Sequence, residues 1–182
     1  GQFSATADRG SKSKRGALNS EEGIDLAILA IQLGATYVAR SFSGDKAQLV
    51  PLIKGALEHP GPAFLDVISP CVAFNNHEGS TRSYDYVRNH NEAVNHLDVI
   101  TVHKEITTAY EPGSVQQVPT HDGSVLKLRK LSDDYDSSSR ISAMSYVQSR
   151  YAQGEIVTGL LYVEQDADDL HASLGTTPVP LN

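Results

Sequence analysis

The stretch GATYVARSFSGDKAQLVPLIKGALEHPGPAFLDVI, residues 34–68, decides the fold that this sequence predicts. Residues 36–42 are a β-branched and aromatic run, which predicts a strand. Residues 63–68 are almost continuously apolar, as is typical of a buried parallel strand. A helical pattern lies between them, and another precedes them up to residue 33. The order helix, strand, helix, strand predicts an α/β domain built on a parallel sheet.

Capping signals set the expected ends of the two helices. Residues 19–22 (NSEE) supply an N-cap and first-turn acids for the first helix, and Gly34 occupies a left-handed C-terminal position. Asp45 and Gln48 are spaced like a capping box at the start of the second helix. Pro51 removes a backbone donor, so we expect it to kink the first turns or delay the start. His59-Pro60 ends this helix.

The pattern changes after residue 75. We expect a polar helix, a β-meander with turns at Glu111-Pro112-Gly113 and His121-Asp122-Gly123, a helix to about Ala152, and a final strand. The sequence therefore predicts part of one α/β domain over residues 1–75 and a C-terminal extension over residues 76–182. The expected elements of the extension are a helix at 83–95, the meander within 104–130, a helix from 136, and a strand at 156–163.

Composition excludes several classes of protein. The chain has 182 residues, with 40% apolar residues, 20% charged residues and a net charge of −7. An acidic chain is a poor binder of nucleic acid, because such binding depends on neutralising phosphates. No apolar run approaches the roughly 20 residues of a membrane span. Cys71 is the single cysteine, which excludes an internal disulfide framework and suits a reducing, cytoplasmic location.

Two segments follow the predicted strands, where α/β sheets bind ligands. Residues 41–45 follow the first strand, and residues 69–72 follow the second. Within the second segment, Cys71 is a candidate metal ligand or nucleophile, or alternatively a buried cysteine that acts as a small apolar residue. Residues 1–6 (GQFSAT) are small and hydroxyl-rich, as in a phosphate-binding loop or a terminal linker. The residues alone leave these alternatives open.

Five blocks in the same order resemble a known family, the β subunit of 2-oxoacid:ferredoxin oxidoreductases, and in particular its 2-oxoglutarate branch. The resemblance covers nearly the whole chain, as the C-terminal half of such a subunit. The blocks are GQFSATADRGSKSKRG, GATYVARSFSGD, ISPCVAFNNHEGSTRSY, YEPGSVQQVPTHDGS and GLLYVEQDADDLH.

The resemblance implies a thiamine-diphosphate-binding α/β domain. It implies oxidative decarboxylation of a 2-oxoacid to an acyl-coenzyme A, with electrons passing through a [4Fe–4S] cluster to ferredoxin. An α subunit would be the partner chain. Cys71 matches the last cluster ligand of the family. Gly1, Gln2, Ser4 and Thr6 match the loop beside the diphosphate and its Mg²⁺.

Other parts of the family pattern are absent from this sequence. It contains neither the other three cluster cysteines nor the Gly-Asp-Gly motif and Asn that bind Mg²⁺. One thiolate cannot hold a four-iron cluster. We therefore expect this chain to be a fragment of an enzyme and to be inactive by itself. We predict no catalytic residue within it. The alternative is a non-catalytic binding or structural module that docks on a partner chain.

Overall fold

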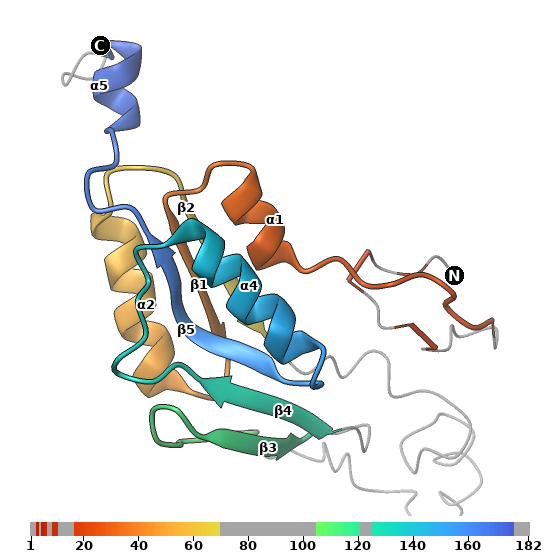
Figure 1. The fold of residues 1–182 in the computed structure, drawn as a ribbon. Helices are drawn as coiled ribbons and strands as arrows, with labels where there is room; N and C mark the ends of the chain where they lie inside the picture. Colours follow the sequence, from red (N-terminus) through yellow and green to blue (C-terminus); the bar gives the residue numbers. More distant parts are fainter. Residues whose placement is uncertain are drawn as a thin grey trace, which may run out of the picture.

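The computed structural model describes residues 3, 5, 6, 9, 10, 17–69, 105–120 and 125–176. In this part of the chain, five strands form one sheet in the order β2-β1-β5-β4-β3, and helices pack against it (Figure 1). The elements are α1 (Leu26–Gln32), β1 (Tyr37–Phe42), α2 (Lys46–Glu58), β2 (Ala63–Ile68), β3 (Val115–Pro119), β4 (Val125–Lys130), α4 (Arg140–Tyr151), β5 (Ile156–Val163) and α5 (Leu170–Leu174).

The α/β class predicted from the sequence is confirmed, but the sheet is mixed rather than parallel. Strands β1 and β2 are parallel and are joined through α2, and β4 and β5 are parallel and are joined through α4. The two units meet where β5 runs antiparallel to β1. Each strand–helix–strand unit is local in sequence, whereas the direction in which the units meet is set by long-range packing.

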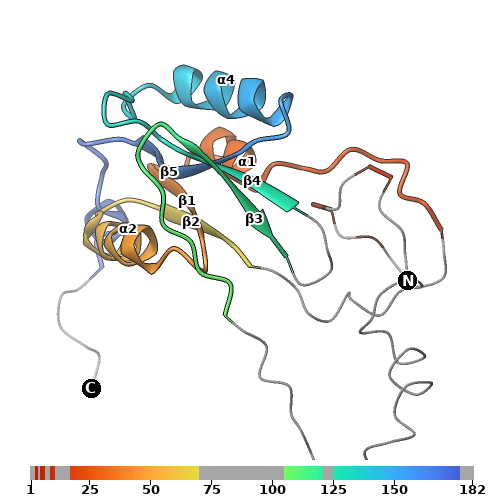
Figure 2. The ribbon, with the colours of Figure 1, turned by 90° about the horizontal axis from the view of Figure 1, so that it is seen from below.

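The helices cover both faces of the sheet, with α1 and α4 on one face and α2 on the other (Figure 2). Alternation along β1 fits this arrangement. The Tyr37 hydroxyl donates to the Leu52 carbonyl of α2 at 2.9 Å. The next residue, Val38, packs into the core with α1, α4 and β5. That core consists of Ala27, Ala30, Ile31, Val38, Leu131, Ala143, Val147, Val157, Leu161 and Tyr162.

The helix α1 begins later than predicted. Its N-cap is Asp25, whose Oδ1 accepts from the backbone N–H groups of Ala27 and Ile28, both at 3.0 Å. Asn19 instead closes its own turn, because its Oδ1 accepts from the N–H of Glu21. The predicted end is confirmed, because Gly34 has a φ of 94°.

The predictions for α2 and α4 are largely confirmed. Asp45 caps α2 by accepting from the N–H of Gln48 at 3.2 Å, and His59 ends the helix. Pro51 does not delay the start, because α2 begins at Lys46 and continues through it. The helix α4 ends near the predicted residue but begins at Arg140, since Ser139 is the N-cap.

The strand β2 is not the buried strand that its apolar run predicts. It lies at the edge of the described sheet, and Val67 is 40% exposed. The most buried strands are β1 and β5, which occupy the centre. The position of a strand at the edge or in the centre of a sheet depends on partner strands that are distant in sequence. The composition of β2 alone could therefore not show that it lies at an edge.

In the predicted extension, β3 and β4 form an antiparallel hairpin, as expected for part of a meander. The turn Glu111-Pro112-Gly113 is confirmed by a φ of 72° at Gly113. The predicted helix at 83–95 lies outside the described residues. The division at residue 75 stays a prediction, although the sheet contains strands from both sides of it. Among the described helices, none has the length and apolar character needed to cross a bilayer.

Candidate functional site

The predicted cofactor loop reaches the folded domain beside α1. Thr6 lies in an exposed turn, and the neighbouring Ala5 carbonyl accepts from the N–H of Ile24 at 2.8 Å. Ile24 directly precedes Asp25, the N-cap of α1. The loop is thereby attached to the start of the first helix. Gly1, Gln2 and Ser4 lie outside the described residues.

The second predicted site follows β2. The strand ends at Ile68, and the next residue, Ser69, is exposed. Cys71, the predicted cluster ligand, lies two residues further along the sequence and outside the described residues. The structure therefore describes the strand that leads toward Cys71 but not the cysteine itself.

The carboxyl end of β1 is covered by the chain itself. Ser41, Phe42 and Asp45 are at most 1% exposed. The N–H of Thr108 donates to the Gly44 carbonyl at 3.1 Å. A Cβ added at Gly44 would lie 1.9 Å from the Ile106 carbonyl oxygen, so only glycine allows this approach. Two strand ends were predicted to bind ligand. The end of β1 is therefore filled by residues 106–108 of the chain itself, whereas Ser69, directly after β2, is exposed.

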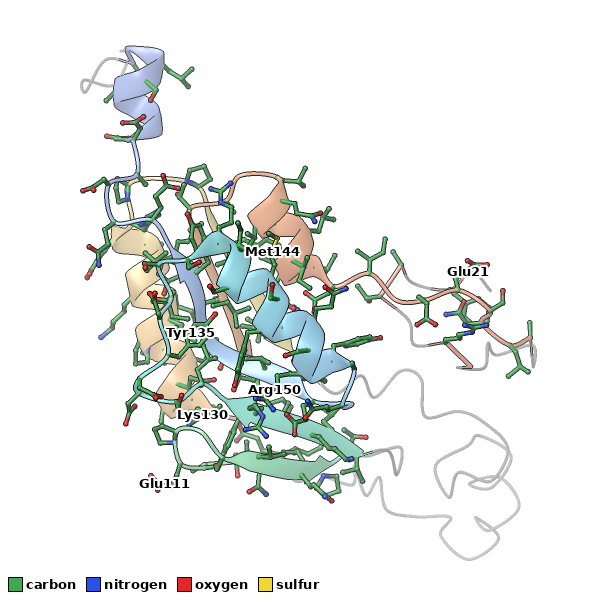
Figure 3. The ribbon with its side chains drawn as sticks, viewed as in Figure 1. Glu21, Glu111, Lys130, Tyr135, Met144 and Arg150 are labelled. Carbon is green, nitrogen blue, oxygen red and sulfur yellow. The ribbon has the colours of Figure 1, made fainter. Side chains whose placement is uncertain are left out.

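A buried polar cluster fixes this cover. Lys130 Nζ lies 2.9 Å from Asp45 Oδ2 and 4.5 Å from the centre of the Tyr110 ring. The Tyr110 hydroxyl lies 2.7 Å from the Thr158 hydroxyl, and Thr158 is fully buried. Burial raises the pKa of Tyr110, which favours the neutral phenol in this cluster. Figure 3 shows Lys130 at the end of β4 that lies nearest the start of α2.

A second buried cluster joins α1, β1 and β2. The Arg40 guanidinium donates from Nε to Asp66 Oδ2 and from Nη2 to Asp25 Oδ1, both at 2.7 Å. Burial alone would lower the pKa of Arg40, but the hydrogen bonds and negative charges of the two aspartates raise it. One cation between two carboxylates leaves a formal charge of −1 in the cluster.

Sequence reasoning missed this cluster, although a signal was present. Each of the two predicted apolar strands contains one charged residue, Arg40 in β1 and Asp66 in β2. In the parallel register of the structure these two residues are direct partners. A charge in the middle of an apolar strand requires a partner, so the pairing could have been inferred.

A metal or cluster site requires several ligating side chains close together. Within the described ranges, no group of three or more His, Cys, Asp or Glu side chains is arranged to hold a metal ion. Thr6 is the only predicted cofactor-loop residue among them. The described residues therefore form neither a cluster site nor a Mg²⁺ site by themselves.

Comparison with known proteins identifies relatives of one class, the 2-oxoacid oxidoreductases that include 2-oxoacid:ferredoxin oxidoreductases and a 2-oxoglutarate synthase. The chain is 41% identical over 76 residues to the 2-oxoacid:ferredoxin oxidoreductase subunit β of a Sulfolobus species, a match that covers 41% of this chain and 25% of that relative. It is 40% identical over 75 residues to the 2-oxoglutarate synthase subunit KorB of Methanocaldococcus jannaschii, covering 41% of this chain and 28% of that relative. No family model matches the chain.

A solved structure has the same fold. A chain of the 2-oxoglutarate:ferredoxin oxidoreductase from Magnetococcus marinus, with 2-oxoglutarate, coenzyme A and succinyl-CoA bound, superposes with a TM-score of 0.58 at 22% identity. The match covers 98% of this chain and 49% of that one.

These comparisons confirm the resemblance that the sequence predicts. The curated relatives of the chain are β subunits of 2-oxoacid:ferredoxin oxidoreductases, and one of them is a 2-oxoglutarate synthase subunit. The matches span only about a quarter of the length of these relatives.

Proposed function

We propose that this chain is the C-terminal portion of the β subunit of a 2-oxoacid:ferredoxin oxidoreductase. The observation that carries the proposal is an identity of about 40% to β subunits of this type. The fold supports it, because nearly the whole chain superposes on half of a chain from a 2-oxoglutarate:ferredoxin oxidoreductase. The two relatives with 2-oxoglutarate in their names favour 2-oxoglutarate as the substrate.

The reaction would be the oxidative decarboxylation of the 2-oxoacid with transfer of the acyl group to coenzyme A. An α subunit, ferredoxin and coenzyme A would be the partners. Thiamine diphosphate, with Mg²⁺, would supply the chemistry that stabilises the carbanion left by loss of CO₂. Electrons would leave through a [4Fe–4S] cluster to ferredoxin.

We assign two roles to residues of this chain. Cys71 would ligate the cluster, since a thiolate is the ligand that iron–sulfur clusters use. Gly1, Gln2, Ser4 and Thr6 would border the thiamine diphosphate. The anchoring of the Ala5–Thr6 turn to Ile24, at the start of α1, supports the second role because it fixes the loop on the folded domain.

Calorimetry of the complete β subunit with its α subunit tests this function. With Mg²⁺ present we expect saturable binding of thiamine diphosphate, and in the loaded enzyme we expect turnover of 2-oxoglutarate that requires coenzyme A. Absence of thiamine diphosphate binding would contradict the proposal and favour a non-catalytic module. Binding with turnover of pyruvate but not 2-oxoglutarate would contradict the substrate assignment alone.

A further inference from the structure

Arg40 connects two parts of the molecule that border the proposed site. Its side chain is only 6% exposed, and it donates one hydrogen bond to Asp25 and one to Asp66, each at 2.7 Å. An arginine can hold two carboxylates at once, because its guanidinium is a rigid, planar fork of donors. A lysine cannot reproduce both bonds in the same geometry.

The two carboxylates lie on different segments. Asp25 caps α1 and directly follows Ile24, whose N–H binds the Ala5 carbonyl next to Thr6. Asp66 lies in β2, three residues before the exposed Ser69. A continuous series of short contacts therefore runs from the turn at Thr6, through Asp25 and Arg40, to the end of β2.

The surroundings of Arg40 make a purely stabilising role a poor explanation. Val38 and Phe42, two residues before and two residues after Arg40 in β1, are fully buried apolar residues. A buried ion cluster contributes little net stability compared with apolar residues of the same volume. What it adds is a defined geometry, because each charge requires its partner at one place.

We propose that Arg40 is a positioning residue that holds the start of α1, to which the Ala5–Thr6 turn is hydrogen-bonded, and the end of β2 in register with each other. The inference rests on the proposed function, because the loop borders thiamine diphosphate only in that function. Arg40 itself touches neither the substrate nor a cofactor in this account. It acts through Asp25 on the loop side and through Asp66 on the side that leads to the cluster ligand.

The test compares Arg40→Met with Arg129→Met in the complete enzyme with both subunits. Arg129 is a matched control, because it also pairs with a carboxylate, that of Glu155, with side chains 19% and 13% exposed, but it lies on β4. We expect Arg40→Met to weaken thiamine diphosphate binding about tenfold or more, as loss of a residue that orients metal ligands weakens metal binding about 10- to 100-fold. It should also alter the electron paramagnetic resonance spectrum of the reduced cluster. Arg129→Met should leave both unchanged.

Amide hydrogen exchange measures directly whether Arg40 holds these two segments in place. In Arg40→Met, amide exchange should rise in residues 19–25 and 63–69. In Arg129→Met it should rise in β4 instead. Asp66→Asn provides a milder variant in case Arg40→Met fails to assemble, since it removes one charge and keeps the shape. Asp66→Asn should change thiamine diphosphate binding, the cluster spectrum and amide exchange in the same direction as Arg40→Met, but by smaller amounts.

The outcomes are distinguishable. If the unaltered enzyme binds thiamine diphosphate and Arg40→Met or Asp66→Asn behaves like Arg129→Met in binding and spectrum, the positioning role is wrong and the proposed function stands. If the unaltered enzyme binds no thiamine diphosphate, the proposed function fails and the positioning role fails with it.

Discussion

Lys130 Nζ lies 2.9 Å from Asp45 Oδ2, and this contact joins the end of β4 to the residue that caps α2. The two residues come from different strand–helix–strand units of the sheet. Asp45 is 1% exposed, and its Oδ2 accepts no hydrogen bond of acceptable geometry. The positive charge of Lys130 therefore compensates the negative charge of this carboxylate. The contact closes the carboxyl end of β1 with the chain's own residues.

We expect Lys130→Met to be strongly destabilising, because it leaves a buried carboxylate without a cation. Removing one partner of a buried pair costs about 3 to 5 kcal/mol of unfolding free energy. Lys46→Met is the control, since Lys46 pairs with Glu105 on the surface, with side chains 68% and 61% exposed. The control should cost less than about 1 kcal/mol. Urea unfolding measures both.

Asp45→Asn in the Lys130→Met background provides the counter-test. The asparagine keeps an oxygen that can cap α2 but removes the unpaired charge, so it should recover part of the lost stability. Equal unfolding free energies for Lys130→Met and Lys46→Met would show that the buried pair has no special role.

Gly44→Ala should displace the segment that covers β1. The new Cβ would overlap the Ile106 carbonyl oxygen, which lies 1.9 Å from its position. Overpacking of this kind costs about 1 to 3 kcal/mol. Limited proteolysis should then cut more readily within residues 105–110. Ser43→Ala, one residue away, should leave the cleavage rate as it is, and unchanged cleavage in Gly44→Ala would contradict the close packing.

The raised pKa of Tyr135 predicts that the protein loses stability at high pH. Its hydroxyl donates to the Leu161 carbonyl at 2.9 Å, and burial is the main cause that raises the pKa of Tyr135 from 10.0 to about 12. Above pH 10 the unfolded chain loses this proton while the folded chain keeps it. The unfolding free energy should therefore fall between pH 10 and 12, and below pH 10 the contribution of Tyr135 is fully present.

Urea unfolding across this pH range, with and without Tyr135→Phe, checks the prediction. The variant should be less stable at neutral pH, by about 1 kcal/mol for the lost hydrogen bond. Its unfolding free energy should depend less on pH above 10. An identical pH dependence in both proteins would show that Tyr135 titrates normally in the folded state.

Local sequence signals predicted most of the elements. The caps at Asp45, Gly34 and His59 lie where expected, because each depends on contacts within a few residues. The local signals were wrong at the start of α1, where two nearby segments both contain residues that can cap a helix. Asp25 takes the place predicted for residues 19–22 at the start of α1, because Asp25 is held by Arg40 as well as by the helix.

Long-range arrangement could not be predicted from such signals. The apolar run of β2 gave no sign that this strand lies at an edge, and nothing local to β5 fixes it antiparallel to β1. For the candidate site, position and composition singled out the loop at Thr6 and the segment with Cys71, and resemblance to a family supplied the roles predicted for them. The pairing of Arg40 with Asp66 had a signal in the sequence, one charged residue in each apolar strand, but the third member, Asp25, joins the cluster through a contact between α1 and β1 that no local signal indicates.

We propose that this chain is the C-terminal portion of the β subunit of a 2-oxoacid:ferredoxin oxidoreductase. The most direct test of this proposal is ferredoxin reduction under anaerobic conditions by the complete enzyme, with 2-oxoglutarate and coenzyme A, together with the iron content of unaltered and Cys71→Ser forms. The account predicts reduction that requires both substrates in the unaltered enzyme, and loss of iron and of ferredoxin reduction in Cys71→Ser. Unchanged iron and unchanged reduction in that variant would contradict the role of Cys71, and no reduction by an iron-loaded, unaltered enzyme would contradict the function.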